Sequence, residues 1–358
     1  MAVKVNKKLI YLLFFLFVMG LTIYTMLQGN DIGEILIAIS SMNVGYLFLA
    51  ILAALIFVVL EAVIIWYLMH GLGETNSMLR CIAYSFIGYF YSSITPSALG
   101  GQPMQLYYMR KDGNSLSNSS VILMILALFS KLVLALIGVV LLVFWYAPLT
   151  YYLKSFMALY YLGLALNIIS VVVLLAAMFV PGIVRQITQS VDGFLIRIHI
   201  LKLSKERQLK IESFIEGYHG AVNFLMLNKT KILVVFILTF LQRNCLYILT
   251  YFVYKGFSLS GTSMVTVVLL QAAIYVAVEM MPLPGAQGIT ELMYYTVFQG
   301  VFTSALLTPS LLVTRGLDFY FLVIISLIVV VAKSFLLKKD VKSIKIEKKT
   351  NNLEEPII

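Results

Sequence analysis

Long apolar runs separated by short polar segments make up most of this chain of 358 residues. A helix needs about 20 mainly apolar residues to cross the hydrocarbon core of a bilayer. Runs of that length occupy residues 9–27, 44–69, 119–146, 156–180, 232–254 and 309–335. The pattern predicts an all-α polytopic membrane protein, built as a helical bundle of about 6–8 spans.

Two further apolar segments, 81–109 and 264–303, are interrupted by proline and glycine. Proline removes a backbone donor and stops a helix, so the freed carbonyl groups need partners in protein or in a wet cavity. Broken segments at matching places in two halves of a chain predict the substrate site of a transporter. The helix-breaking residues are Pro96, Pro103, Pro282 and Pro284, and the predicted site includes Gly100, Gly101, Gln102, Gly285 and Gly288.

The distribution of lysine and arginine predicts the topology. Basic residues gather at the amino end, in 181–231 and in 336–358, which assigns these segments to the cytoplasm, together with both termini. Segment 81–109 is then a re-entrant element entered from the cytoplasm. Segment 264–303 is either a second re-entrant pair, entered from outside, or two short spans. The two broken elements are therefore expected in an inverted arrangement.

The same pattern divides the chain into an integral membrane domain at 1–335 and a basic cytoplasmic tail at 336–358. Residues 28–43 carry a helical apolar pattern that favours a short helix in the outer interface. The loop 181–231 is amphipathic, and we expect its helix to lie on the inner leaflet; a docking surface for a partner is the alternative. The apolar stripe of this loop consists of Phe214, Ile215, Tyr218 and Val222.

Composition supports the membrane class and excludes others. Hydrophobic residues make up 61% of the chain and charged residues 12%, against roughly 25% charged in soluble domains. The net charge of +10 lies mostly in the segments assigned to the cytoplasm, so it indicates orientation and contact with anionic lipid. The chain has three histidines, no His-Glu-x-x-His motif and no phosphate loop, so we expect no metal site and no cofactor, and we name no catalytic residue.

Ionisable residues inside the apolar segments are the candidate chemistry. Each costs about 2.5–3.5 kcal/mol at a helix centre, so such residues face the bundle interior, pair with one another or mark a pathway. They are Glu61, Lys131, Arg243, Glu279, Glu291, Arg315 and Asp318. Charges of both signs suit a zwitterionic or mixed-charge ligand, with cations on a phosphate and carboxylates on an ammonium. Glu61 and Arg243 lie deepest and are expected to form a buried pair or to line the site.

Structural roles compete with ligand binding at the other positions. Arg315 and Asp318 are three residues apart on one helix, so they can neutralise each other. Glu291 follows the second break by one turn, where the helix dipole favours a carboxylate. Glu279 lies near the end of a span and can reach interfacial water, whereas Lys131 lies too deep in its span to do so easily.

Both broken segments resemble motifs of the lysylphosphatidylglycerol synthase transmembrane-region family, over about residues 5–335. Segment 81–109 resembles its Pro-x-x-x-Gly-Gly stretch, through Pro96, Gly100, Gly101, Gln102, Pro103 and the following Arg110. Segment 264–303 is similar to its later motif, through Pro282, Pro284, Gly285, Gly288 and Glu291. Arg315 stands where the family tends to place an arginine in the last span, while Lys131 stands near a position where many relatives are expected to have arginine.

The resemblance implies the flippase-like membrane domain of bacterial multiple peptide resistance factors and their stand-alone relatives. Such a domain moves lysyl-phosphatidylglycerol between the leaflets of the bacterial cell membrane, which lowers the negative surface charge and gives resistance to cationic antimicrobial peptides. The implied partner is a phospholipid of the phosphatidylglycerol or lysyl-phosphatidylglycerol class. A separate synthase protein and a homo-oligomer are further partners that this interpretation allows.

Two alternatives stay open. The family name implies a phosphatidylglycerol lysyltransferase that uses lysyl-tRNA, and only in that case is nucleic acid an expected partner. We expect no synthase domain in this sequence, because only 23 residues follow residue 335. The second alternative is a non-transporting partner of a lipid or glycolipid enzyme, which would act through the basic loop and tail.

Overall fold

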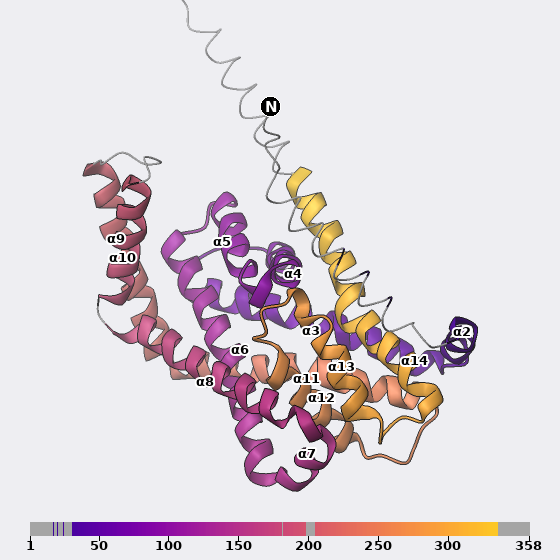
Figure 1. Cartoon of the computed structure of the whole chain (residues 1–358). Helices are drawn as coiled ribbons and strands as arrows, with labels where there is room; N and C mark the ends of the chain where they lie inside the picture. The colour runs from indigo at the N-terminus through magenta and orange to yellow at the C-terminus, as the bar shows by residue number, and fades with distance from the viewer. Residues whose placement is uncertain are drawn as a thin grey trace, which may run out of the picture.

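The computed structural model describes residues 31–180, 182–197 and 205–335, together with Phe17, Gly20 and Tyr24. The tail 336–358 and nearly all of the expected first span at 9–27 lie outside these residues. Within the described part the chain forms helices and no strand, so the prediction of an all-α polytopic membrane protein is confirmed (Figure 1). The helices long and apolar enough to cross a membrane are Val44–Gly71, Leu116–Phe144, Tyr146–Phe179, Lys229–Gly256 and Ser304–Phe335.

The helices form two units with the same order of elements. Each unit has a long helix, a shorter helix, a one-turn 3-10 helix, a second short helix and another long helix. The first unit comprises α3 (Val44–Gly71), α4 (Met78–Ile94), η1 (Pro96–Ala98), α5 (Gly101–Lys111) and α6 (Leu116–Phe144). The second comprises α11 (Lys229–Gly256), α12 (Met264–Val278), η3 (Pro284–Ala286), α13 (Ile289–Phe298) and α14 (Ser304–Arg315), which is the first part of the last span, Ser304–Phe335. The long helices α3 and α11 pack along each other at the centre.

Local sequence explains why the two units fold alike. Both α3 and α11 follow an asparagine, Asn43 or Asn228. Both α4 and α12 begin after a serine, Ser77 or Ser263, whose side chain accepts a hydrogen bond from a backbone N–H group three residues on. Both breaks carry the sequence Pro-x-Ala-x-Gly, at 96–100 and at 284–288. This short shared motif is a sequence signal for the repeat.

The two breaks have nearly the same backbone. Thr95 (φ −114°, ψ 143°) and Leu283 (φ −119°, ψ 139°) are extended, as the residue before a proline prefers. The residue after each proline is then left-handed, Ser97 with φ 51° and Gly285 with φ 59°. The one-turn helices η1 and η3 contact each other, so the breaks of the two halves meet.

The lengths of the broken helices favour one of the two interpretations of 264–303. Helices α12 and α13 have 15 and 10 residues. At 1.5 Å per residue these are about 22 and 15 Å long, short of the roughly 30 Å hydrocarbon core. Neither helix can span the membrane alone, which favours a re-entrant pair like that of α4 and α5.

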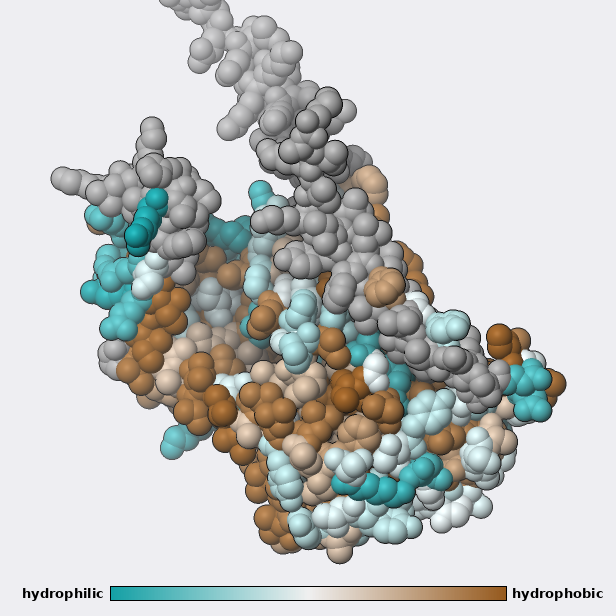
Figure 2. All heavy atoms as spheres, viewed as in Figure 1, coloured by the Kyte–Doolittle hydropathy of each residue, from teal (hydrophilic) through white to brown (hydrophobic). Residues whose placement is uncertain are grey.

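Between the two units lie α7 (Tyr146–Leu153), η2 (Lys154–Phe156), α8 (Met157–Phe179), α9 (Ile183–Arg197) and α10 (Lys205–Leu227). Helices α9 and α10 form a hairpin that carries hydrophilic side chains on its visible face (Figure 2). Ion pairs join its two arms, Arg185 to Glu212 at 2.6 Å and Arg207 to Asp192 at 2.9 Å. The short helix expected within 28–43 is α2 (Ile32–Ser40), capped by Asp31.

The apolar stripe of the loop differs from its expected placement on the inner leaflet. Ile215, Tyr218 and Val222 are 1–3% exposed, because α10 packs against α6. The hydroxyl group of Ser117 on α6 donates to the backbone carbonyl of Phe214 at 3.0 Å. The stripe is therefore covered by protein rather than by lipid.

Candidate functional site

A cavity of about 560 Å³ lies where the two breaks meet. Ser97, Ala98 and Leu99 of the first break line one part of it, and Leu283, Gly285 and Ala286 of the second break line another. Helices α3, α6 and α11, the end of α12 and the last span contribute charged side chains. The ionisable residues in the wall are Glu61, Lys131, Arg243, Glu279, Arg315 and Asp318. The structure thus brings most of the sequence-predicted charges to one cavity.

One wall holds two cations around a single carboxylate. Lys131 Nζ lies 2.7 Å from Glu279 Oε1, and Arg243 Nη1 lies 2.8 Å from Glu279 Oε2. The three side chains are 12–18% exposed, so their charges are only weakly screened by solvent. Arg243 Nε is buried and has no hydrogen-bond partner among the described residues. This cationic triad therefore has an excess positive charge and an unused donor.

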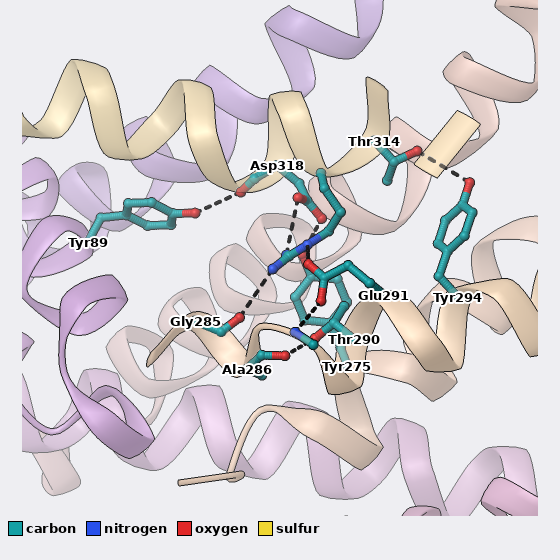
Figure 3. A network of polar contacts seen from close by, with 11 residues as sticks. Tyr89, Tyr275, Gly285, Ala286, Thr290, Glu291, Tyr294, Thr314 and Asp318 are labelled. Carbon is teal, nitrogen blue, oxygen red and sulfur yellow. Dashed lines mark hydrogen bonds and ion pairs between the residues drawn. The ribbon is translucent and has the colours of Figure 1, made fainter. Parts of the chain in front are cut away.

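A second triad has the opposite balance, with one cation between two carboxylates (Figure 3). Arg315 Nε lies 2.7 Å from Glu291 Oε1, and Nη1 lies 3.4 Å from Asp318 Oδ1. Arg315 Nη2 donates to the carbonyl oxygen of Gly285 at 3.2 Å. The side chains of this anionic triad are at most 5% exposed. All three nitrogens of the guanidinium group are thus occupied within the protein.

The anionic triad also fixes the second break. Glu291 Oε2 accepts a hydrogen bond from the backbone N–H group of Gly288 at 2.6 Å, which caps α13. Asp318 lies in a π-helical turn, Gly316–Phe321, that continues α14. Its Oδ2 accepts from the hydroxyl group of Tyr275 at 3.0 Å, and its backbone carbonyl accepts from Tyr89 at 2.7 Å. One network therefore connects the last span to α4, α12 and α13.

Glu61 is half-buried and differs from the other acids around the cavity. Gln105 Nε2 donates to its Oε1 at 2.8 Å, and Gln242 Nε2 donates to its Oε2 at 3.4 Å. No ion pair to Glu61 occurs within the described part of the chain. Of the two alternatives expected for Glu61 and Arg243, the buried pair does not form, because the guanidinium group binds Glu279, whereas both residues line the cavity. Both acids face the same cavity, and Glu61 is the one held only by amides.

A sequence model of the family described as "Lysylphosphatidylglycerol synthase TM region" matches residues 9–326. The chain belongs to this family. An uncharacterized protein of Mycoplasma genitalium is 28% identical over 106 residues, which are 29% of this chain and 27% of that relative. The chain thus matches about a quarter of the relative's length. Membership supports a multi-pass membrane protein with a lipid-related function.

The family motif residues have distinct positions around the cavity. Gln102 lines it, and so does Gly285. Gly100 and Gly101 instead let α5 approach α4, since a Cβ on Gly101 would lie 2.7 Å from the carbonyl oxygen of Gly88. Gly288, with φ 83°, supplies the N-cap of α13.

The prolines act on the backbone rather than on the cavity. Pro96 and Pro284 occupy the first positions of η1 and η3, where their missing N–H groups cost nothing. Pro282 lies in the irregular stretch between α12 and η3. Pro103 lies in the first turn of α5. It lines a different hollow, on the side of that helix away from the central cavity.

The contacts bear on two further expectations for the charged residues, and the pairing of Arg315 with Asp318 is met. Glu279 does not rely on interfacial water, since it binds Lys131 and Arg243. Arg315 and Asp318 do pair, but the shorter contact of Arg315 is to Glu291.

Sequence reasoning also missed neutral polar residues of the cavity. Gln105 binds Glu61, and Ser92, Ser93 and Ser130 line the cavity. A glutamine three residues after Gln102, in the same short helix, was the available signal. Single serines in apolar helices carry little signal, because they commonly bond the carbonyl group one turn back, as Ser93 does to Tyr89.

Proposed function

We propose that this chain binds the polar headgroup of a membrane lipid in the central cavity and carries it between the leaflets. The observation that carries the proposal is the combination of Glu61, a carboxylate with no ion pair among the described residues, and a cation-rich triad in the same cavity. A buried charge without a counter-ion is costly, so a ligand that supplies one is favoured. Family membership supports a lipid as that ligand.

The contacts favour particular roles for the charges. Glu279 and Glu291 already bind cations, so Glu61 is the acid best suited to a ligand ammonium group. Each guanidinium nitrogen of Arg315 already donates to an oxygen of the protein, whereas the triad of Lys131, Arg243 and Glu279 has one more cation than carboxylates. A ligand phosphate is therefore better served by Arg243 and Lys131 than by Arg315.

A headgroup with both a phosphate and an ammonium group fits this division of charge. The family name directs the proposal to the lysyl-phosphatidylglycerol class. Its movement to the outer leaflet of a bacterial cell membrane would lower the negative surface charge and oppose binding of cationic antimicrobial peptides. Both termini are placed in the cytoplasm in this proposal. The two breaks would rock against each other around the cavity, which opens in turn to each side.

The cellular test co-expresses the chain with a separate synthase and labels amino lipids of the outer leaflet with a membrane-impermeant reagent. We expect labelling with the unsubstituted chain and labelling near the empty-vector level with Glu61→Gln. Glu34→Gln, an acid on the exposed helix α2, is the matched control and should label normally. Equal labelling with Glu61→Gln and Glu34→Gln would contradict the proposal.

The same strains distinguish transport from synthesis. In a host without the synthase, thin-layer chromatography should detect no new lysyl lipid from this chain. New lysyl lipid would replace the proposed translocase by a lysyltransferase.

A further inference from the structure

A second hollow lies on the side of α5 that faces away from the central cavity. It has a volume of about 770 Å³ and runs between α5 and the final turns of the last span. Met104, Tyr107 and Tyr108 line it from α5, and Val330, Val331 and Ser334 line it from the last span. We call it the α5 groove. Helix α5 contributes Gln102 and Gln105 to the central cavity, so it is the wall between the two hollows.

The α5 groove has the surface chemistry of a lipid contact. Its lining is mostly aromatic and aliphatic, and Tyr107 and Val331 are 49% and 45% exposed. Lys111 lies over the ring of Tyr107, one of the lining residues, with its Nζ 5.7 Å from the ring centre. A lysine beside tyrosine rings is typical of the membrane interface, where the ammonium group meets lipid phosphates.

An ion pair connects the end of α5 to the last span. Asp112, at the end of α5, accepts hydrogen bonds from Lys333 Nζ at 2.7 and 2.9 Å and from the Tyr84 hydroxyl group at 2.7 Å. The Lys333 and Asp112 side chains are only 15% and 8% exposed. An ion pair thus joins α5 to the last span, the two helices that line the groove.

We infer that the α5 groove binds one acyl chain of an anionic phospholipid whose phosphate lies against Lys111. In hydrocarbon an apolar groove that opens sideways is filled by a lipid tail, and the basic residue at its end selects a negative headgroup. This site is separate from the central cavity and goes beyond the proposed transport, since a chain that moves no lipid could still hold this one.

The test places a photoreactive benzoylphenylalanine at position 107 of the full chain in nanodiscs of equal phosphatidylglycerol and phosphatidylcholine. The same probe at position 161, an exposed tyrosine on α8, reports general lipid contact. We expect crosslinks at 107 to be enriched in phosphatidylglycerol about fivefold over those at 161. Crosslinking of 107 to another part of this chain, or equal lipid composition at the two positions, would overturn the inference.

Two pairs of variants refine the test. Val331→Trp fills the groove and should reduce lipid crosslinking at 107, whereas Ile328→Trp, on a lipid-facing side of the same helix, should not. Lys111→Gln should remove the phosphatidylglycerol enrichment, whereas Lys231→Gln should not, although Lys231 also lies over a tyrosine ring, that of Tyr67. Equal effects within either pair would count against the groove as the site. Glu61→Gln should keep the crosslink at 107, which separates this inference from the transport proposal.

Discussion

At the scale of single residues, the buried charges of this protein divide by what satisfies them. Arg315 is enclosed by Glu291, Asp318 and the Gly285 carbonyl group at 2.7–3.4 Å. Glu61 is held by neutral amides alone within the described residues. The first arrangement is complete without a ligand, and the second is not. Stability and function should therefore respond to different substitutions.

Arg315→Met should destabilise the protein strongly. It leaves two carboxylates buried without their cation, and removal of one partner from a buried ion pair costs about 3–5 kcal/mol. We expect a clear fall in melting temperature in detergent, and partial recovery when Glu291 and Asp318 are also replaced by Gln and Asn. Glu61→Gln should keep the melting temperature close to that of the unsubstituted chain. A larger fall with Glu61→Gln than with Arg315→Met would contradict this division.

Lys131→Met should weaken ligand binding more than folding. Glu279 keeps both hydrogen bonds from Arg243, at 2.8 and 3.2 Å, so no carboxylate is orphaned. The cavity loses one cation, and loss of one charge-assisted contact of about 1.5 kcal/mol lowers affinity roughly tenfold. Binding of a short-chain lysyl-phosphatidylglycerol, measured by calorimetry, checks this. Unchanged affinity would remove Lys131 from the headgroup site.

At the scale of elements, the two breaks have nearly the same backbone conformation, but they tolerate different residues at the left-handed position. Ser97 and Gly285 occupy equivalent left-handed positions, with φ of 51° and 59°. A left-handed conformation costs a non-glycine residue about 1–2 kcal/mol. Ser97 has room for its side chain, whereas a Cβ on Gly285 would collide with the Phe319 ring.

Ser97→Gly should therefore be tolerated, with the free energy of unfolding unchanged or raised by up to about 1 kcal/mol. Gly285→Ser should lower the melting temperature and expression, because Phe319 must move and Arg315 loses the alignment of its carbonyl partner. Thermal melts of both variants in the same detergent provide the comparison. Similar destabilisation by the two substitutions would show that the left-handed positions of the two breaks do not differ in the residues they tolerate.

The sequence was sufficient to predict elements because their signals are local. Runs of apolar residues predicted α3, α6, α8, α11 and the last span, and Pro96 and Pro284 marked the breaks. The partners of the charges could not be predicted, since the rotation of each helix is set by tertiary packing. Glu279 thus binds Lys131, which is 148 residues away, rather than water. The burial of Tyr218 against α6 depends on the same long-range packing.

At the scale of the whole molecule, two units of like order bring their breaks into contact around one cavity. The anionic triad ties the last span to the second break, and Lys333 ties the same span to the end of α5. The last span therefore links both broken elements, and its π-helical turn holds Asp318 of the first attachment. Such turns interrupt the regular hydrogen-bond ladder and are frequent at functional sites.

Reconstituted transport tests the central claim most directly. Proteoliposomes with fluorescent lysyl-phosphatidylglycerol are treated with a membrane-impermeant quencher, and the rate at which protected lipid becomes accessible is measured. The account predicts rapid loss of protection with the unsubstituted chain and with Glu34→Gln, and a rate near that of protein-free liposomes with Glu61→Gln. A Glu61→Gln rate equal to that of the unsubstituted chain, in protein of unchanged melting temperature, would contradict headgroup carriage through this cavity.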